Sequence, residues 1–383
     1  MALASGNRVR LAYVQESTHG TTPGSPTLAT LRATQRNIKL VKNILRSEEV
    51  RASRQIADAR HGFNRVEGQV GYQLSRADYD DFIRFAMGGT WAAFSESGSP
   101  NITFATAGDT ITRDAGSWLT DGIRPGDIIT VASTTNNNGD FRVLSVTATV
   151  ITVEENLTDE GPVSATVDVK GERIDIGTTL YTATIERQFL DIGKYEAFRG
   201  CAVNQMSFRA EPEAIIGGQF DIVGMSAAAM AGSSVGTGTT DPTTNSPFDS
   251  FIAQIYEAGG ATAVATGFNF TLNNSRNLQG VIGSRFSPDV FEGDAVINGT
   301  LQVFFEDETL YNKFINETES SIWLTLNDVA VSGEFINVVF PRVKFNTADI
   351  DPPQRGPIVK QMQFEALESP TFGTSMWVQK SNS

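Results

Sequence analysis

The sequence contains few of the residues that build metal centres and nucleophilic active sites. Its 383 residues include one cysteine, Cys201, and two histidines, His19 and His61. One cysteine excludes an internal disulfide framework and a cysteine-rich zinc site. A Cys–His catalytic pair stays open, but a lone cysteine is more often a small buried hydrophobic residue. We therefore expect no catalytic residue, no cofactor and no metal ion.

Long apolar runs are absent as well. No stretch approaches the roughly 20 apolar residues that are needed to span a bilayer. The first residues, from Met1 to Arg8, lack the apolar core of a secretory signal. We expect a protein that is made in a cytoplasm and has no membrane partner.

Basic residues are outnumbered, with 30 against 44 acidic ones and a net charge of −14 at pH 7. An acidic surface does not bind nucleic acid tightly, because binding depends on cations that neutralise phosphates. The charge suits either simple solubility or a surface that DNA passes without adhering. Both interpretations stay open at this point.

What the sequence has in quantity indicates a mainly β fold. Glycine (35) and phenylalanine (24) are plentiful, threonine is abundant, and long helix-forming runs are scarce. Alternation of apolar and polar residues predicts a strand over 66–74, and a short amphipathic helix follows, with Ser75 as its N-cap. The other strands are expected at 37–45, 181–188, 203–210 and 218–223.

Changes in composition divide the chain into units. Residues 95–173 contain short β runs between turn clusters, which predicts a small β-domain inserted into the surrounding unit. Residues 226–249 are rich in Gly, Ser and Thr and are interpreted as a flexible linker. The expected division is a first unit of 1–94 and 174–225, the insertion, the linker, and a second unit of 250–383. The terminal segments 1–30 and 368–383 are expected to be arms that become ordered only in an assembly.

The two units share a pattern of a strand, a sharp turn and a short amphipathic helix. Residues 66–83 can be aligned with 297–315, which places Gly68 at the position of Gly299. Upstream, 37–45 resembles 267–274, and downstream 205–210 resembles 342–347. The expected core of the two copies is Val70, Leu74, Tyr79 and Phe82 in the first, and Leu301, Phe305, Tyr311 and Phe314 in the second. We interpret the chain as a tandem duplication of one β-rich unit carrying one helix.

A duplicated β-unit suits ring formation, because head-to-tail contacts between copies close into rings that can stack. Edge strands become useful when a neighbour continues the sheet. The excursions 46–65 and 275–296 are candidates for contacts between rings, and an ordinary solvated loop is the alternative. The candidate inter-ring residues are Arg46, Glu48, Glu49, Arg51, Arg54, Asp58, Arg60, Arg65, Arg285, Asp289 and Glu292.

Three stretches carry a resemblance to a known family. Residues 299–314, 340–345 and 191–208 resemble the tail tube proteins of siphoviruses, the bacteriophages with long non-contractile tails. The resemblance covers most of the chain outside 95–175 and is a diffuse pattern without a catalytic signature. It implies a virion protein of two packed antiparallel sheets flanked by a helix, whose inner strands join into a barrel around a lumen.

The resemblance also implies partners. The family's hexameric ring would become a trimer here, since each chain carries two copies, and the inserted domain resembles small modules that decorate phage tails. A tape measure protein would occupy the lumen, tail terminator and distal tail proteins the ends, and DNA would pass without specific binding. The candidate acidic residues of the lumen are Glu186, Asp221, Glu306 and Glu365.

Two alternatives remain. Another ring protein of the same fold, at the head–tail junction or the distal tail, is compatible with the duplication. A carbohydrate-binding or hydrolytic β-protein could use paired carboxylates, such as Asp80–Asp81 or Glu154–Glu155, for acid–base chemistry. Adjacent carboxylates point apart, which argues against that use. A calcium site at the acidic turn 349–351 is open, although no EF-hand spacing is present.

Overall fold

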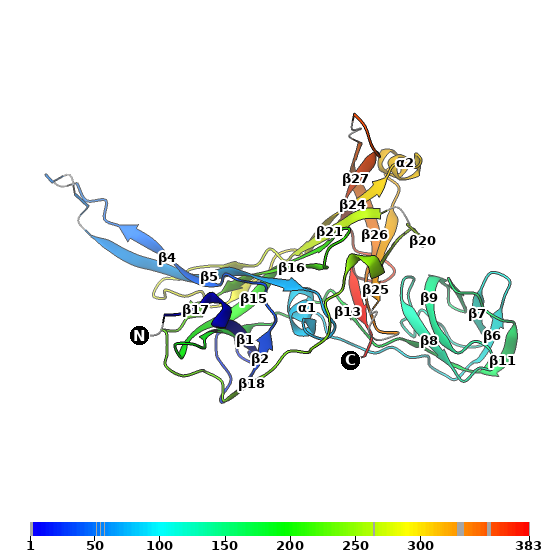
Figure 1. Cartoon of the computed structure of the whole chain (residues 1–383), viewed down its shortest axis with the longest axis horizontal. Coiled ribbons are helices and arrows are strands. Elements are labelled where there is room, and N and C mark those ends of the chain that lie inside the picture. Colours follow the sequence, from blue (N-terminus) through cyan, green and yellow to red (C-terminus); the bar gives the residue numbers. More distant parts are fainter. Residues whose placement is uncertain are drawn as a thin grey trace.

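The computed structural model describes residues 3–50, 52–53, 55–56, 58–262, 265–327, 333–350 and 354–382. Arg51 and Arg54, two of the candidate inter-ring residues, and Asp351 of the acidic turn lie outside this part. The predicted mainly β class is confirmed, because strands dominate the described chain and its two α-helices are short. The strands form one extended sheet system, a separate seven-stranded sheet and a small two-stranded ladder (Figure 1).

The first half of the sheet system combines strands from both sides of the inserted segment. β14 pairs with β1 and β15, β15 pairs with β16, and β16 pairs with β5, which also pairs with β4. These elements are β1 (Val9–Gln15), β2 (Thr27–Leu31), β3 (Gln35–Arg36), β4 (Lys39–Arg46), β5 (Ala59–Gln73), α1 (Asp80–Met87), β14 (Ala183–Phe189), β15 (Lys194–Ala210), β16 (Gly217–Gly224) and β17 (Ser226–Ala227).

The second half has the same order of pairings. β25 pairs with β19 and β26, β26 pairs with β27, and β27 pairs with β24, which also pairs with β21. These elements are β18 (Gly238–Thr240), β19 (Ala253–Glu257), β20 (Gly260–Ala261), β21 (Ala265–Asn273), β24 (Val296–Phe304), α2 (Thr309–Ile315), β25 (Ser320–Asn327), β26 (Phe335–Ile350), β27 (Val359–Ala366) and β28 (Trp377–Lys380).

The antiparallel pairing of β15 with β21 joins the long strands of the two halves into one sheet. The strands β5, β16, β15, β21, β24, β27 and β26 therefore run side by side as one continuous sheet. At one end β4 and β5 extend away from the body as a two-stranded arm, which is plain in Figure 1. Between β21 and β24, the ladder of β22 (Asn277–Leu278) and β23 (Val290–Phe291) belongs to the second excursion.

The inserted segment folds around its own core. Its strands are β6 (Asn101–Ala105), β7 (Thr110–Arg113), β8 (Ile128–Ala132), β9 (Gly139–Val146), β10 (Val150–Val153), β11 (Glu160–Ser164) and β12 (Thr166–Val169). Trp118, Ile129 and Val143 are among the residues that this core buries. After it, β13 (Glu172–Asp175) returns to the body and pairs with β28. In Figure 1 the inserted domain lies at the opposite end of the molecule from the β4–β5 arm.

Three segments interpreted as arms or linkers are packed parts of this fold. β1 is a core strand in which Leu11 is fully buried, and Trp377 of β28 is fully buried as well. The expectation of arms that become ordered only in an assembly is therefore wrong for the described residues 3–30 and 368–382. The interpretation of 226–249 as a flexible linker is also wrong, because β18 pairs with β2 and Arg32 Nη1 donates to the Asn245 carbonyl at 2.7 Å.

Helix α1 begins five residues after the predicted N-cap. Ser75 Oγ donates to Asp78 Oδ2 at 2.5 Å, so these two residues do interact as a capping pair would. Ala77, however, has a φ of 65°, which lies in the left-handed region and is incompatible with a helix at that point. The helix therefore starts at Asp80 and ends at Gly88, which adopts the left-handed conformation of a C-terminal cap.

Candidate functional site: one polar face of the long sheet

The continuous sheet presents two faces of opposite chemistry. Successive residues of a strand point to opposite faces, so the pairing register assigns each residue to a face. One row of paired residues crosses seven strands on the first face and is almost entirely apolar: Tyr72, Gly218, Phe208, Phe270, Gly299, Phe364 and Phe345. This face forms the main core, and ring contacts of Tyr79 and Phe82 with Phe220 place α1 over it.

The opposite face is polar and mostly uncharged. One row consists of Gly71, Gln219, Ser207, Thr271, Asn298, Glu365 and Lys344. The next row consists of Gln73, Gly217, Arg209, Asn269, Thr300, Gln363 and Thr347. Amides and hydroxyls predominate in both rows, and the few charges are of both signs. Antiparallel sheets with one core face and one solvated face show this alternation.

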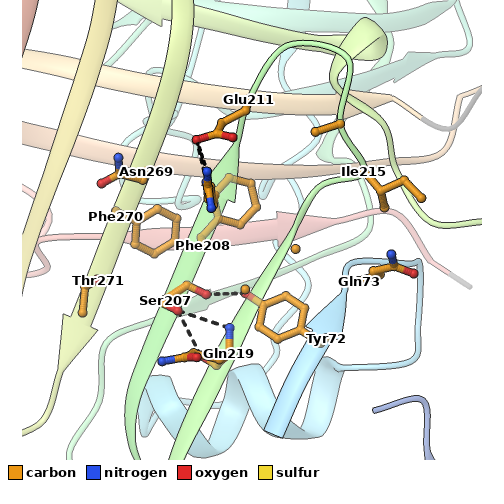
Figure 2. A pocket seen from close by; sticks show the side chains of 14 residues that line it. Tyr72, Gln73, Ser207, Phe208, Glu211, Ile215, Gln219, Asn269, Phe270 and Thr271 are labelled. Atoms are coloured by element: carbon orange, nitrogen blue, oxygen red, sulfur yellow. Dashed lines mark hydrogen bonds and ion pairs between the residues drawn. The ribbon is translucent and has the colours of Figure 1, made fainter. Parts of the chain in front are cut away.

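Figure 2 shows a part of the polar face around Ser207 and Gln219. The Tyr72 hydroxyl donates to the Ser207 carbonyl at 2.8 Å, and the Gln219 backbone N–H donates to Ser207 Oγ at 3.2 Å. These residues line a shallow hollow of about 560 Å³, whose single carboxylate, Glu211, accepts from Arg209 Nε at 2.6 Å. Glycoside hydrolysis needs two carboxylates across the substrate, so the hollow does not fit the hydrolytic alternative.

The four candidate acidic residues of the lumen lie in different environments. Asp221 and Glu365 are on the polar face, opposite Gln205 and Asn298. Glu306 is exposed in the loop between β24 and α2. The expectation for Glu186 is wrong, because this residue is fully buried and its carboxylate accepts from Ser234 Oγ and the Val235 N–H, each at 2.7 Å.

Burial perturbs one carboxyl group of the polar face. Desolvation raises the pKa of Asp221 above its ordinary value, and a hydrogen bond from Gln69 acts in the opposite direction. Glu365 faces Lys344 on the neighbouring strand. The acidic residues Asp221 and Glu365 share this face with the basic residues Arg209 and Lys344, so acidic charge is not concentrated there.

The paired carboxylates of the hydrolytic alternative are occupied by structural contacts. Asp80 bonds to Lys380 at 2.5 Å, and Asp81 to Arg84 at 2.7 Å. Glu154 accepts from the Tyr256 hydroxyl at 2.8 Å, and Glu155 from the Arg142 backbone N–H at 2.8 Å. Glu154 and Glu155 both line one cavity of about 350 Å³, together with Arg142 and Lys170, and each of the two carboxylates is held there by its structural contact.

Cysteine and histidine also lack the setting of a reactive site. Burial raises the pKa of the Cys201 thiol well above its ordinary value, which disfavours the nucleophilic thiolate. Among the described residues no group of histidine, cysteine and carboxylate side chains is placed to hold a metal ion.

The candidate inter-ring residues gather on the β4–β5 arm and the second excursion. Arg46 ends β4, Arg60 and Arg65 lie in β5, and Glu48, Glu49 and Asp58 lie between the two strands. β5 already begins at Ala59, so the last part of the excursion 46–65 is a strand. The Arg285 carbonyl accepts from the Asn64 N–H at 2.8 Å, so the second excursion lies beside β5.

Several of these charges already have partners within the chain. Arg60 pairs with Asp58 at 3.1 Å, and Glu292 with the buried Arg276 at 2.7 Å. Asp289 lies 3.9 Å from His19. Contacts to another molecule would therefore compete with existing ion pairs at these positions.

Exposed apolar side chains on the same two excursions were not expected from the sequence. Single exposed apolar side chains are ordinary, but several on neighbouring segments mark a candidate contact surface. They are Ile44, Leu45, Val50 and Ile56 on the arm, and Val281, Ile282, Phe286 and Phe291 on the second excursion. An apolar residue inside a charged, turn-rich stretch is the sequence signal that could have revealed them.

The expected core positions of the two copies are not equivalent. Val70, Leu74, Tyr79, Phe82 and Leu301 are buried, and Phe314 packs partly against the main core. Phe305 and Tyr311 are 41% and 37% exposed, so their assignment to the core is wrong. Helix α2 buries no residue fully, in contrast to α1.

Comparison with known families agrees with this architecture. The family model of the phage tail tube protein matches residues 6–366. The chain belongs to the phage tail tube protein family. It is a structural component of the virion tail, as that family is. No curated protein gives a significant match to this tail tube protein. None of its described helices has the length and apolar character to cross a membrane.

Proposed function

We propose that this tail tube protein assembles with copies of itself into rings that stack into the tube through which phage DNA leaves the virion. The observation that carries the proposal is the continuous sheet with one apolar face covered by the protein's own core and one polar face. A sheet of this kind, continued from chain to chain, closes into a barrel with its polar face toward the channel.

Two repeated units in each chain support a trimeric ring with six quasi-equivalent positions. The order of strand pairings is the same in both halves, and even the irregularities correspond. β15 has a bulge at Asn204 beside β16, and β26 has one at Asn346 beside β27. Bulges of this kind are conserved features of a fold, so their agreement favours a tandem duplication. The sequence comparison aligned 205–210 with 342–347, but the bulges align Gln205 with Thr347. The two alignments differ by five residues.

The channel would present amides and hydroxyls to the DNA and to a tape measure protein before ejection. Such groups exchange hydrogen bonds with water at little net gain in free energy, and without clustered cations they offer phosphates no strong attraction. Three chains would carry 3 × −14 = −42 charges per ring, which repels DNA at longer range. Tail terminator and distal tail proteins would bind the two ends of the tube.

The β4–β5 arm and the second excursion would join one ring to the next. Their exposed apolar residues, such as Leu45 and Ile282, would be covered by the adjacent ring. The inserted domain lies away from the arm (Figure 1) and would decorate the outside of a siphovirus tail. Synthesis in the bacterial host cytoplasm fits this role.

Negative-stain electron microscopy of the purified chain at increasing concentration tests the proposal. We expect tubes about 100 Å wide, an estimate from two-layer sheets around a pore. Rings that never stack would instead favour a head–tail or distal ring protein of the same fold. A monomer at every concentration would contradict both functions.

A further inference from the structure

The chain contains one complete example of the contact that joins two repeated units. β15 of the first half pairs antiparallel with β21 of the second half, with Gln205 opposite Asn273 and Phe208 opposite Phe270. The two phenylalanine rings stack with their centroids 5.2 Å apart. If the halves are equivalent, the same contact can form between chains.

The two edges needed for that contact are open within the described chain. β4 corresponds to β21 and pairs only with β5. β26 corresponds to β15, and beyond Val343 it pairs only with β27, because its pairing with β25 ends there. These edges lie at the two ends of the continuous sheet, so a contact between them is head-to-tail and generates a ring or a helix of chains.

The register of the contact follows from the strand pairings. Asn204 and Asn346 are corresponding bulges, so Gln205 corresponds to Thr347. Gly68 matches Gly299, so the preceding residues Glu67 and Asn298 correspond. Lys39 is opposite Glu67 and Thr271 is opposite Asn298, so Lys39 corresponds to Thr271. Transferring the β15–β21 register gives the opposed pairs Thr347–Val41, Ala348–Leu40, Asp349–Lys39 and Ile350–Ile38, the second residue of each being on a neighbouring copy.

We propose that β26 of one copy continues onto β4 of the next in this register, with Asp349 opposite Lys39. This inference rests on the proposed function, since it specifies how the copies in a ring meet. The register matches apolar residues on the core face, Ala348 with Leu40 and Ile350 with Ile38. On the polar face it joins opposite charges, and within the described residues neither Lys39 nor Asp349 has a partner.

The backbone of β4 is oriented for this contact. The Asn37 N–H donates to the Gln69 carbonyl at 3.0 Å, so Asn37 and Lys39 direct their backbone groups toward β5. Ile38 and Leu40 therefore direct theirs to the open edge, where the Ile38 carbonyl accepts from Arg187 Nη1 at 3.0 Å. A carbonyl has two lone pairs, so this bond leaves room for a second donor. A one-residue slip would turn every apolar side chain of the strand to the polar face.

Cysteine cross-linking tests the register. Lys39 and Asp349 would form a non-hydrogen-bonded pair with Cα atoms about 4.5 Å apart, which suits a disulfide. The double variant Lys39→Cys/Asp349→Cys, oxidised under assembly conditions, should give covalent multimers on a non-reducing gel. The native Cys201 is buried and adds little background. The matched control is Lys42→Cys/Asp349→Cys, in which an exposed lysine of the same strand lies about 10 Å farther along.

The expected result is at least tenfold more cross-linked multimer for the first variant than for the control. If electron microscopy shows rings or tubes but the control cross-links as well as the first variant, the register is wrong and the proposed function stands. Absence of any assembly would overturn both.

Charge reversal is a second test that needs no cysteine. Lys39→Asp or Asp349→Lys should raise the concentration needed for assembly about fivefold, and the combined swap should restore the parental concentration. A swap that fails to restore assembly of the folded protein would refute the pairing.

Discussion

A buried ion pair between the inserted domain and the body offers a quantitative test of how firmly the two are joined. Asp127 Oδ2 lies 2.6 Å from Arg173 Nη1, and both side chains are completely buried. Asp127 Oδ1 also accepts from Trp377 Nε1 of β28 at 3.1 Å. Asp127 belongs to the inserted domain and Arg173 to β13, so the pair connects two separately built cores.

Asp127→Ala would leave the Arg173 charge buried without its close partner, and the remaining carboxylate, Asp175, lies 3.8 Å from Arg173 Nε. Breaking a buried pair in this way costs about 3–5 kcal/mol. Asp140→Ala is the matched control, because Asp140 pairs with Lys170 at 2.6 Å at a partly exposed site, where such pairs contribute at most about 1 kcal/mol. Urea unfolding followed by tryptophan fluorescence measures both changes, and Trp377 reports on the site itself. An equal loss of unfolding free energy in the two variants would refute the reasoning. The double variant Asp127→Leu/Arg173→Met should be more stable than Asp127→Ala, and a double variant that is no more stable would refute it as well.

Four further outcomes are expected. Phe340→Ala should lower the free energy of unfolding by about 3–5 kcal/mol, because the ring is fully buried among Phe268, Phe270 and Phe364; the 79% exposed Phe251 is the control, and similar urea midpoints for the two alanine variants would contradict the packing. Cys201 should react slowly with a thiol reagent at pH 8 and rapidly in urea, because burial raises its pKa; fast native labelling would show the site to be open. Burial raises the pKa of Asp221, so the parent protein loses stability as this carboxyl group ionises, and Asp221→Asn avoids that loss. The urea midpoint of the variant should therefore exceed that of the parent by more at pH 7 than at pH 4. A difference in midpoint that shrinks as pH rises would contradict the direction of the pKa shift. Leu45→Ser, at a 61% exposed position of the arm, should leave the urea midpoint unchanged and shorten the tubes seen by microscopy; tubes of parental length would remove the arm from ring stacking.

Alternation predicted strands well where one face of a strand is buried. Residues 66–74 are an example, with Val66 and Val70 fully buried on the core face. The rule gave no guidance on residues 59–65, the outer part of β5, which are largely exposed or half-buried and show no apolar–polar alternation. It also misplaced Glu186, because β14 is covered on both faces and its polar residues are satisfied by internal hydrogen bonds. Periodicity reports burial on one side and cannot distinguish these two cases.

The polar face was accessible from the sequence only in part. Gln219 and Asp221 alternate with Phe220 and Ile222, which identifies one polar side of a strand. That this side joins Thr271 and Asn298 into one surface depends on the β15–β21 pairing, whose partners lie far apart in the chain. Acidic residues alone do not identify the polar face in the sequence, because that face consists mainly of amides and hydroxyls.

Cryo-electron microscopy of the assembled protein tests the central claim most directly. A reconstruction should place Gln219, Ser207, Thr271 and Asn298 on the wall of the channel, with the sheet continuous around it. A tube whose channel is lined by other elements, with this face directed outward or buried between rings, would contradict the account.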